Sequence, residues 1–269
     1  MKYKFIPVDN DINKAIAFAN TLDLNNIKNV QRIKQKPFYI PTLDVVEMLQ
    51  KEGFQLKGVA EQRGKNRKIS SHYLDLHHPD FKMYDRKGNI ESLFTVKLSN
   101  STNGNTALQV QPGAFRYVCI NNMMHRDYAT AKIKHTEVDY NKLPQIINQL
   151  TNQADRYLDS FRNFKNVILT VEQANALARD AYRIKFNDDF DLNRADYVNN
   201  LRASQVNLEQ EEKVLQLLKV NRIEDEGNDL WTVFNRIQEN LTADIKNFNT
   251  DIKLNQQLFG LAEQYAIAI

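Results

Sequence analysis

Hydrophobic and polar positions follow two different periods along this chain, and the period changes close to Pro144. Before that point, short segments alternate between apolar and polar residues, as half-buried strands do. After it, apolar residues recur three and four positions apart, which is the spacing of helices with one buried face. The pattern predicts an α+β fold: an N-terminal, mainly antiparallel sheet region with a flanking helix (1–140), followed by a mostly helical C-terminal region (141–269) packed on it.

In the first region, Asp11 is positioned to cap a helix over 11–22, and a second helix begins near Thr42 and ends before Gly53. Composition around the strands marks the connections between them, because glycine, proline and asparagine favour turns. We therefore expect strands over 54–62, 71–76, 92–98, 107–111, 114–120 and 131–135, a loop over 77–90, a turn at Asn103-Gly104 and a bend at Pro112-Gly113.

In the second region, apolar residues from Leu143 to Phe161 share one helical face, which predicts a single long helix. Thr170 and Asp229 are N-cap residues in front of two further apolar-periodic segments. The expected helices after the first cover 170–186, 195–201, 208–218, 230–241 and 256–266. Trp231 lies on the apolar face of its helix, where we expect it to anchor the packing.

The chain contains one cysteine, Cys119, which excludes an internal disulfide framework and any multi-cysteine metal site. A single cysteine is also compatible with a reducing compartment. The N-terminal segment shows no apolar core of a signal peptide, and no run approaches the roughly 18 apolar residues of a membrane span. We therefore expect a location in the cytoplasm of the host cell and no membrane contact.

Charge is distributed unevenly along the chain, although the total is only +3. Residues 1–140 hold 21 Lys+Arg against 14 Asp+Glu, a net of +7, whereas residues 141–269 have a net of −4. This asymmetry favours a polyanionic partner, and an ordinary solvated surface is the alternative.

The segment 98–136 is dense in polar groups, and within it Arg116 stands between Phe115 and Tyr117 in a predicted strand. Alternation places the two rings on one face and the guanidinium on the other. An arginine beside exposed rings is typical of sheets that hold single-stranded nucleic acid. The alternative is an arginine paired with a carboxylate while the rings lie in the core. On the first interpretation, Arg116 and Tyr117 are candidate nucleic-acid-binding residues.

Two basic segments extend that interpretation. The predicted turn after the first strand could present several cations to a phosphate backbone, and a second basic stretch precedes Phe38 and Tyr39. The alternative for both is a solvated surface. The turn carries Arg63, Lys65, Arg67 and Lys68, and the second stretch carries Lys28, Arg32, Lys34 and Lys36.

Histidines and the cysteine could support chemistry of another kind. All five histidines, His72, His77, His78, His125 and His135, fall within one part of the chain. Their spacing shows no metal-ligand pair on a strand or helix, so we expect no metal and no cofactor. Cys119 beside a histidine would be a nucleophile and base, but a lone strand cysteine between apolar residues is more often a buried hydrophobe. We assign no catalytic residue.

Several segments together resemble the DUF932 family of phage- and plasmid-encoded proteins, which is named for its unknown function. The central piece departs from the family pattern at one point, where Asn121-Asn122 replaces an expected Asn-Gly after the cysteine. The matching pieces are FYIPTLDVVEMLQKEGF (38–54), SHYLDL (71–76), LSNSTNGNTALQVQPGAFRYVCINNMM (98–124), IKHT (133–136), TVEQANALARDAY (170–182) and DLWTVFNRIQENL (229–241). The resemblance implies an origin in a mobile element and no established activity.

From these observations we expect a protein that binds single-stranded DNA as a homo-oligomer in phage recombination or replication, with strand annealing as one form of this activity. One alternative is an interaction protein that blocks a host defence complex through a host protein. The other is an enzyme that uses Cys119 or the histidines, although a binding protein without catalysis is the favoured class.

Overall fold

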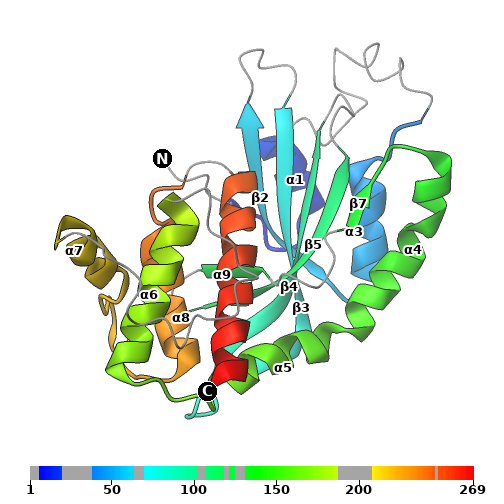
Figure 1. The fold of residues 1–269 in the computed structure, drawn as a ribbon. Coiled ribbons are helices and arrows are strands. Elements are labelled where there is room, and N and C mark those ends of the chain that lie inside the picture. The colour runs from blue at the N-terminus through cyan, green and yellow to red at the C-terminus, as the bar shows by residue number, and fades with distance from the viewer. Residues whose placement is uncertain are drawn as a thin grey trace. The chain divides into compact units, whose positions relative to one another are not determined.

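The computed structural model confirms the α+β fold and divides into two compact units (Figure 1). We call residues 3–115 and 128–155 the sheet unit, and residues 1–2, 116–127 and 156–269 the helical unit. The predicted boundary at residue 140 falls within a helix of the sheet unit. The structure describes residues 6–19, 38–63, 70–101, 107–117, 121–124, 131–186, 208–245 and 248–269.

Antiparallel pairing organises the sheet unit, and its central strand is also its longest. The strand order is β1-β2-β3-β4-β5, with β7 paired to β5. All pairings with a described register, which are β1 with β2, β2 with β3, β3 with β4 and β5 with β7, are antiparallel. The strands are β1 (Ile6–Pro7), β2 (Gln55–Arg63), β3 (Ser70–Tyr84), β4 (Ile90–Ser101), β5 (Leu108–Arg116) and β7 (Ala131–Ile133).

Local sequence signals explain where the helices of the sheet unit begin and end. Asp11 caps α1 (Ile12–Phe18) by accepting hydrogen bonds from Asn13 N and Lys14 N. Helix α3 (Thr42–Lys51) packs against β2 and α4 (Glu137–Asn152). Gly53 follows α3 with φ of +94°, and a β-carbon there would lie 2.8 Å from Nε2 of His78. Both the backbone and the close approach therefore require glycine.

The predicted loop over 77–90 is wrong for residues 77–84, because β3 continues to Tyr84, whereas the turn expected within that loop is present at residues 85–89. The strand shows a shift in register between His78 and Lys82, where β3 carries extra residues relative to β4. Pro79 lies in this irregular stretch, where a missing backbone donor is tolerated. Polar composition suggested a loop, but His77 and His78 are buried strand residues.

Two further expectations need correction. Residues 108–116 form one continuous strand through Pro112-Gly113, since the fixed φ of proline lies at the margin of the extended region. The single helix expected over 143–161 is two helices, α4 and α5 (Ala154–Phe164), separated at Gln153. Helix α4 starts earlier than its apolar face suggested, because Thr136 caps it, and Pro144 lies inside it.

Aromatic rings form the core of the helical unit. Phe161 of α5 contacts Trp231 and Phe259 at ring-centroid distances of 5.2 and 5.0 Å. Trp231 is 1% exposed, which confirms it as a packing residue. The elements are α6 (Val171–Phe186), α7 (Leu208–Leu217), the 3-10 helix η3 (Ile223–Asp225), α8 (Leu230–Thr242), α9 (Phe248–Ala268) and the short strand β6 (Asn121–Met124). None of the helices described by the structure is long and apolar enough to cross a membrane.

A buried hydrogen-bond network joins α3 to the two central strands. Nε2 of His72 on β3 lies 2.7 Å from Oγ1 of Thr42, and Nδ2 of Asn100 on β4 donates to the same hydroxyl and to the carbonyl oxygen of Ile40. Burial lowers the pKa of His72 to about 4, against a smaller opposing effect of Glu61. His72 is therefore a neutral hydrogen-bonding residue in the folded protein at pH 7.

The low pKa of His72 predicts a dependence of stability on pH. In the unfolded chain a histidine binds a proton near pH 6.5, whereas in the fold it does so only near pH 4. The unfolded state therefore binds more protons between these values, so the free energy of unfolding should fall as the pH is lowered from about 6.5 to about 4. Measured by urea unfolding across this range, the free energy of unfolding of His72→Gln should fall less with decreasing pH than that of the wild type. An equal fall in both proteins would contradict the low pKa of His72.

Candidate nucleic-acid interface

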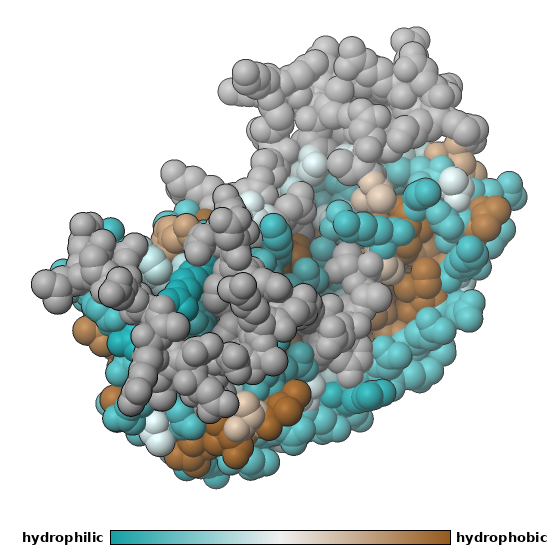
Figure 2. All heavy atoms as spheres, in the orientation of Figure 1, coloured by the Kyte–Doolittle hydropathy of each residue, from teal (hydrophilic) through white to brown (hydrophobic). Residues whose placement is uncertain are grey.

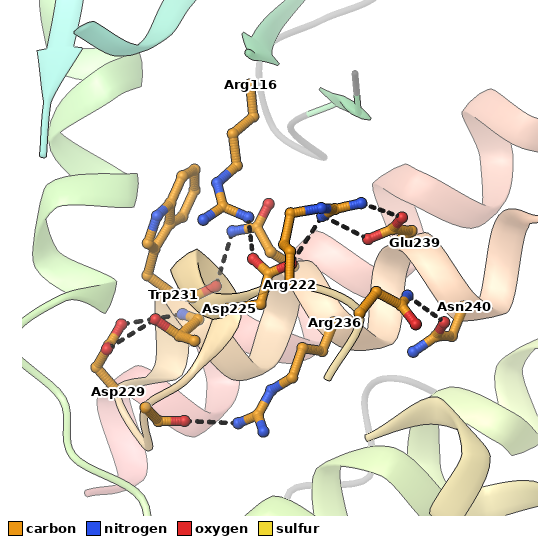
Figure 3. Close-up of polar contacts among 12 residues, drawn as sticks. Arg116, Arg222, Asp225, Asp229, Trp231, Arg236, Glu239 and Asn240 are labelled. Atoms are coloured by element: carbon orange, nitrogen blue, oxygen red, sulfur yellow. Dashed lines mark hydrogen bonds and ion pairs between the residues drawn. The ribbon is translucent and has the colours of Figure 1, made fainter. Parts of the chain in front are cut away.

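Arg116, a predicted nucleic-acid-binding residue, makes a buried ion pair within the helical unit. Its Nη1 donates to Oδ1 of Asp225 at 2.6 Å, and the two side chains are 2% and 1% exposed. The guanidinium also lies over the ring of Trp231, with 5.8 Å between its Cζ and the ring centroid (Figure 3). From the sequence, the alternative to nucleic-acid binding is an arginine paired with a carboxylate, and the structure shows this pairing.

The ion pair belongs to a larger network that reaches α8. Arg222 donates through Nη1 to Oδ2 of Asp225 at 2.7 Å and to Oε2 of Glu239 at 2.8 Å. Figure 3 shows Arg222 between these two carboxylates, so Asp225 serves two arginines at once. Sequence reasoning missed Asp225, which lies 109 positions from Arg116 and follows no recognisable motif. Buried charges of both signs here hold Arg116, η3 and α8 together within the helical unit, which is a structural role.

Tyr117, the second candidate on this strand, follows β5 and is 48% exposed. Its neighbour Phe115 instead lies against His77 in the sheet unit, with 4.8 Å between the ring centroids. One ring is thus at the surface and the other is packed. The guanidinium of Arg116 is held by Asp225, so of the two candidates only Tyr117 has an exposed side chain.

The register of the sheet brings the basic turn to one end of the strands. Arg63, the last residue of β2, pairs with Ser70, the first residue of β3, so the residues between them connect a hairpin. Ser71 in turn pairs with Ser101 at the end of β4. We define the basic edge as this end of the sheet, where β2 and β4 end and β3 and β5 begin.

Tyr39 lies at the same edge, because its hydroxyl donates to the carbonyl oxygen of Ser101 at 3.3 Å. Tyr39 is the third residue after Lys36, the last cation of the second basic stretch. The stretch itself, with Lys28, Arg32, Lys34 and Lys36, lies outside the described residues.

Two exposed lysines add to the basic edge. Ile133 of β7 pairs with Leu108, the first residue of β5, and Lys132 and Lys134 flank it with exposed side chains. Neither lysine was a sequence candidate. The pairing of β7 with β5 that places them here has no local signature, although their alternation around Ile133 is visible in the sequence.

The remaining sequence candidates cannot be placed by their side chains. Arg63 ends β2, but its side chain is not described. The other candidates of the two basic segments, Lys34, Lys36, Lys65, Arg67 and Lys68, lie outside the described residues, as do Cys119 and His125.

A second buried charged cluster lies on the sheet itself. Asp75 of β3 is paired across the strands with Lys97, whose Nζ lies 3.5 Å from Oδ1, and Nε2 of His77 lies 3.0 Å from Oδ2. All three side chains are less than 10% exposed. Burial by itself would raise the pKa of Asp75, but Lys97 and His77 outweigh it and hold that pKa at about 2. Asp75 is therefore ionised at pH 7.

The ion pairs within this cluster limit the chemistry that its side chains could perform. Asp75 orients His77 as a carboxylate orients a general base, but it also neutralises Lys97. Oγ1 of Thr95 and Oε1 of Gln111 are buried without a hydrogen-bond partner within the described structure. Among the described residues, no group of three or more His, Cys, Asp or Glu side chains could hold a metal ion.

The sheet unit and the helical unit, each with its buried charged network, define an α+β protein. Comparison with known families identifies it: the model of the domain of unknown function DUF932 matches residues 35–259. The chain belongs to the DUF932 family, which confirms the resemblance seen in its motifs.

Two curated relatives come from Escherichia coli (strain K12), UPF0380 protein YafZ and UPF0380 protein YfjQ. Each is 26% identical to this chain over 247 residues, which cover 84% of this chain and 81% of the relative. No solved structure gives a significant match.

The double use of Asp225 predicts a large loss of stability when its charge is removed. Asp225→Asn leaves Arg116 buried without its counter-charge, which typically costs about 3–5 kcal/mol. Asp159→Asn is the matched control, because Asp159 pairs with Arg162 at the surface with 58% of its side chain exposed, and such pairs contribute less than about 1 kcal/mol. Urea unfolding at pH 7 measures both, and equal effects would show that burial does not matter here.

Asp75 should stabilise the fold above its unfolded-state pKa and lose this effect in acid. Because its pKa falls from 3.8 to about 2 on folding, the unfolded chain binds the proton first, so stability declines as the pH falls from about 4 towards 2. Asp75→Asn removes this component and leaves Lys97 without its counter-charge, a cost of about 3–5 kcal/mol at pH 7. Asp80→Asn, an exposed position on the same strand, is the control. Acid unfolding curves that coincide for wild type and Asp75→Asn would refute this.

Proposed function

We propose that the sheet unit binds single-stranded nucleic acid at the basic edge. The observation that carries the proposal is that the described residues next to the two basic segments lie at one end of the sheet. Arg63 pairs with Ser70, Ser71 pairs with Ser101, and the Tyr39 hydroxyl donates to the carbonyl oxygen of Ser101. Exposed Lys132 and Lys134 stand at the same edge. Cations from separate segments that converge on one edge are a typical phosphate-binding arrangement.

The proposal depends on the backbone of the nucleic acid rather than on base identity. Lysine and arginine side chains release counterions when they contact phosphates, so binding should weaken steeply with salt. Arg116 does not support the proposal, because its guanidinium is held by Asp225. Neither a cofactor nor a metal is needed for such binding.

The wider biological role is also part of the proposal. A protein of this kind would act in phage or plasmid recombination or replication, as a homo-oligomer along a strand of DNA and in the host cytoplasm. Strand annealing is the activity that this combination favours, because it requires binding to exposed bases without sequence preference.

The two alternative functions have weaker support. An inhibitor of a host defence complex needs an interaction surface, and on the face drawn in Figure 2 the hydrophobic residues of the described chain lie in several patches among hydrophilic ones. An enzyme would need an accessible group, whereas Asp75, His77 and Lys97 are buried and mutually paired.

A matched pair of double variants tests the basic edge. Arg67 and Lys68 lie in the connection between β2 and β3, and Arg86 and Lys87 form an exposed Arg-Lys pair in the turn at the other end of β3. At about 3.3 Å per residue these ends lie about 45 Å apart. Each phosphate contact to a single strand contributes about 0.7 to the slope of log K against log salt, so losing two contacts should cost about 20-fold at 0.1 M salt.

The measurement is fluorescence anisotropy with a labelled single-stranded oligonucleotide over a salt series. We expect the Arg67→Ala/Lys68→Ala variant to bind about 20-fold more weakly with a shallower salt slope, and the Arg86→Ala/Lys87→Ala variant to bind as wild type does. Equal losses in the two variants would indicate a general charge effect, and no salt-sensitive binding by the wild type would refute the function.

A further inference from the structure

We propose that four aromatic rings beside the basic edge form a platform on which bases stack, which makes the site selective for single strands over duplexes. The rings belong to Phe38, Tyr39, His135 and Tyr140. This inference rests on the proposed function and adds to it the part of the nucleic acid that is recognised. In a duplex the faces of the bases are already covered by their neighbours, so only a single strand can offer them to protein rings.

The rings form two pairs from segments that are far apart in sequence. Tyr39 and His135 are stacked, with centroids 4.9 Å apart and planes 13° from parallel. Phe38 and Tyr140 contact each other at a centroid distance of 5.7 Å with planes inclined at 56°. All four side chains are partly exposed, although aromatic residues of this size usually lie in the core.

Hydrogen bonds hold the rings in place. The Tyr39 hydroxyl donates to Ser101 at 3.3 Å, and the Tyr140 hydroxyl donates to Oδ2 of Asp44 at 3.2 Å. The backbone N–H of Ile40 donates to Nδ1 of His135 at 3.1 Å, so the neutral imidazole carries its proton on Nε2. Rings fixed before binding lose little conformational entropy when a base stacks on them, which favours affinity.

An exposed cation adjoins this platform, because Lys134 directly precedes His135 and its side chain is exposed. Proteins that bind single strands without sequence preference combine these same two elements.

The test separates stacking from simple packing by using a substitution that removes the aromatic ring but keeps an apolar side chain. Phe38→Leu removes the aromatic face and retains a branched apolar side chain, and Tyr140→Leu does the same for its partner. Tyr84→Leu is the control, since Tyr84 is 49% exposed at the opposite end of β3. The probes are a fluorescein-labelled 30-nucleotide oligodeoxythymidine and a labelled 30-base-pair duplex, and thermal melting followed by circular dichroism verifies the fold of each variant.

We expect Phe38→Leu and Tyr140→Leu each to weaken binding to the single strand about tenfold, with the salt slope and the weaker duplex binding unchanged. The unchanged salt slope distinguishes a lost stacking contact from a lost phosphate contact. The Tyr84→Leu variant should bind as the wild type does.

Three other results would overturn the inference in different ways. If the wild type binds the single strand but both leucine variants bind it equally well, the rings only pack and the proposed function stands. If the variants lose single-strand and duplex binding together with a changed salt slope, the substitutions have disturbed the basic edge. If the wild type binds neither probe, the proposed function fails, and the stacking platform fails with it.

Discussion

The pairing of β3 with β4 is the constraint on which the rest of the sheet unit depends. The two strands align from Ser71 with Ser101 to Tyr84 with Ile90, which makes this the longest described pairing in the sheet. Its register decides which residues face each side, because a shift by one position would turn every side chain of a strand to the opposite face. The same register brings the end of β4 beside the start of β3, and so creates the basic edge.

Polar contacts on both faces of this pair reinforce that register. On one face Asp75 lies opposite Lys97, and on the other His72 lies opposite Asn100, which reaches Thr42 of α3. A slipped register would leave these groups buried without partners, which is far more costly than a loss of apolar packing. Buried ion pairs add little net stability themselves, so their effect here is to specify one pairing over its alternatives. In the helical unit, the network of Arg116, Asp225 and Arg222 likewise consists of buried charges that specify one arrangement over its alternatives.

Helix caps and a terminal glycine predicted the limits of several helices correctly. Asp11, Thr170 and Asp229 precede α1, α6 and α8, and Gly53 follows α3. The errors arose where distant contacts overrode local composition. Polar residues after Leu76 resembled a loop because nothing nearby revealed that His77 and His78 would pair with Thr95 and Phe94 of β4. For the candidate site, the basic hairpin connection was foreseen, whereas the partner of Arg116 and the approach of Tyr39 to Ser101 required contacts across many residues.

By itself, the sequence determined the α+β class, most helix starts, the basic segments and the membership of the DUF932 family, because periodicity, capping and motifs are local properties of the chain. Only the tertiary structure decided that Arg116 is an internal ion-pair partner, that the histidine-rich stretch is strand, and that Phe38, Tyr39, His135 and Tyr140 contact one another in two ring pairs. These outcomes depend on which distant residues come into contact. Strand register and ion pairing determine those contacts. Both depend on which side chains become buried, and this is decided only when the chain folds.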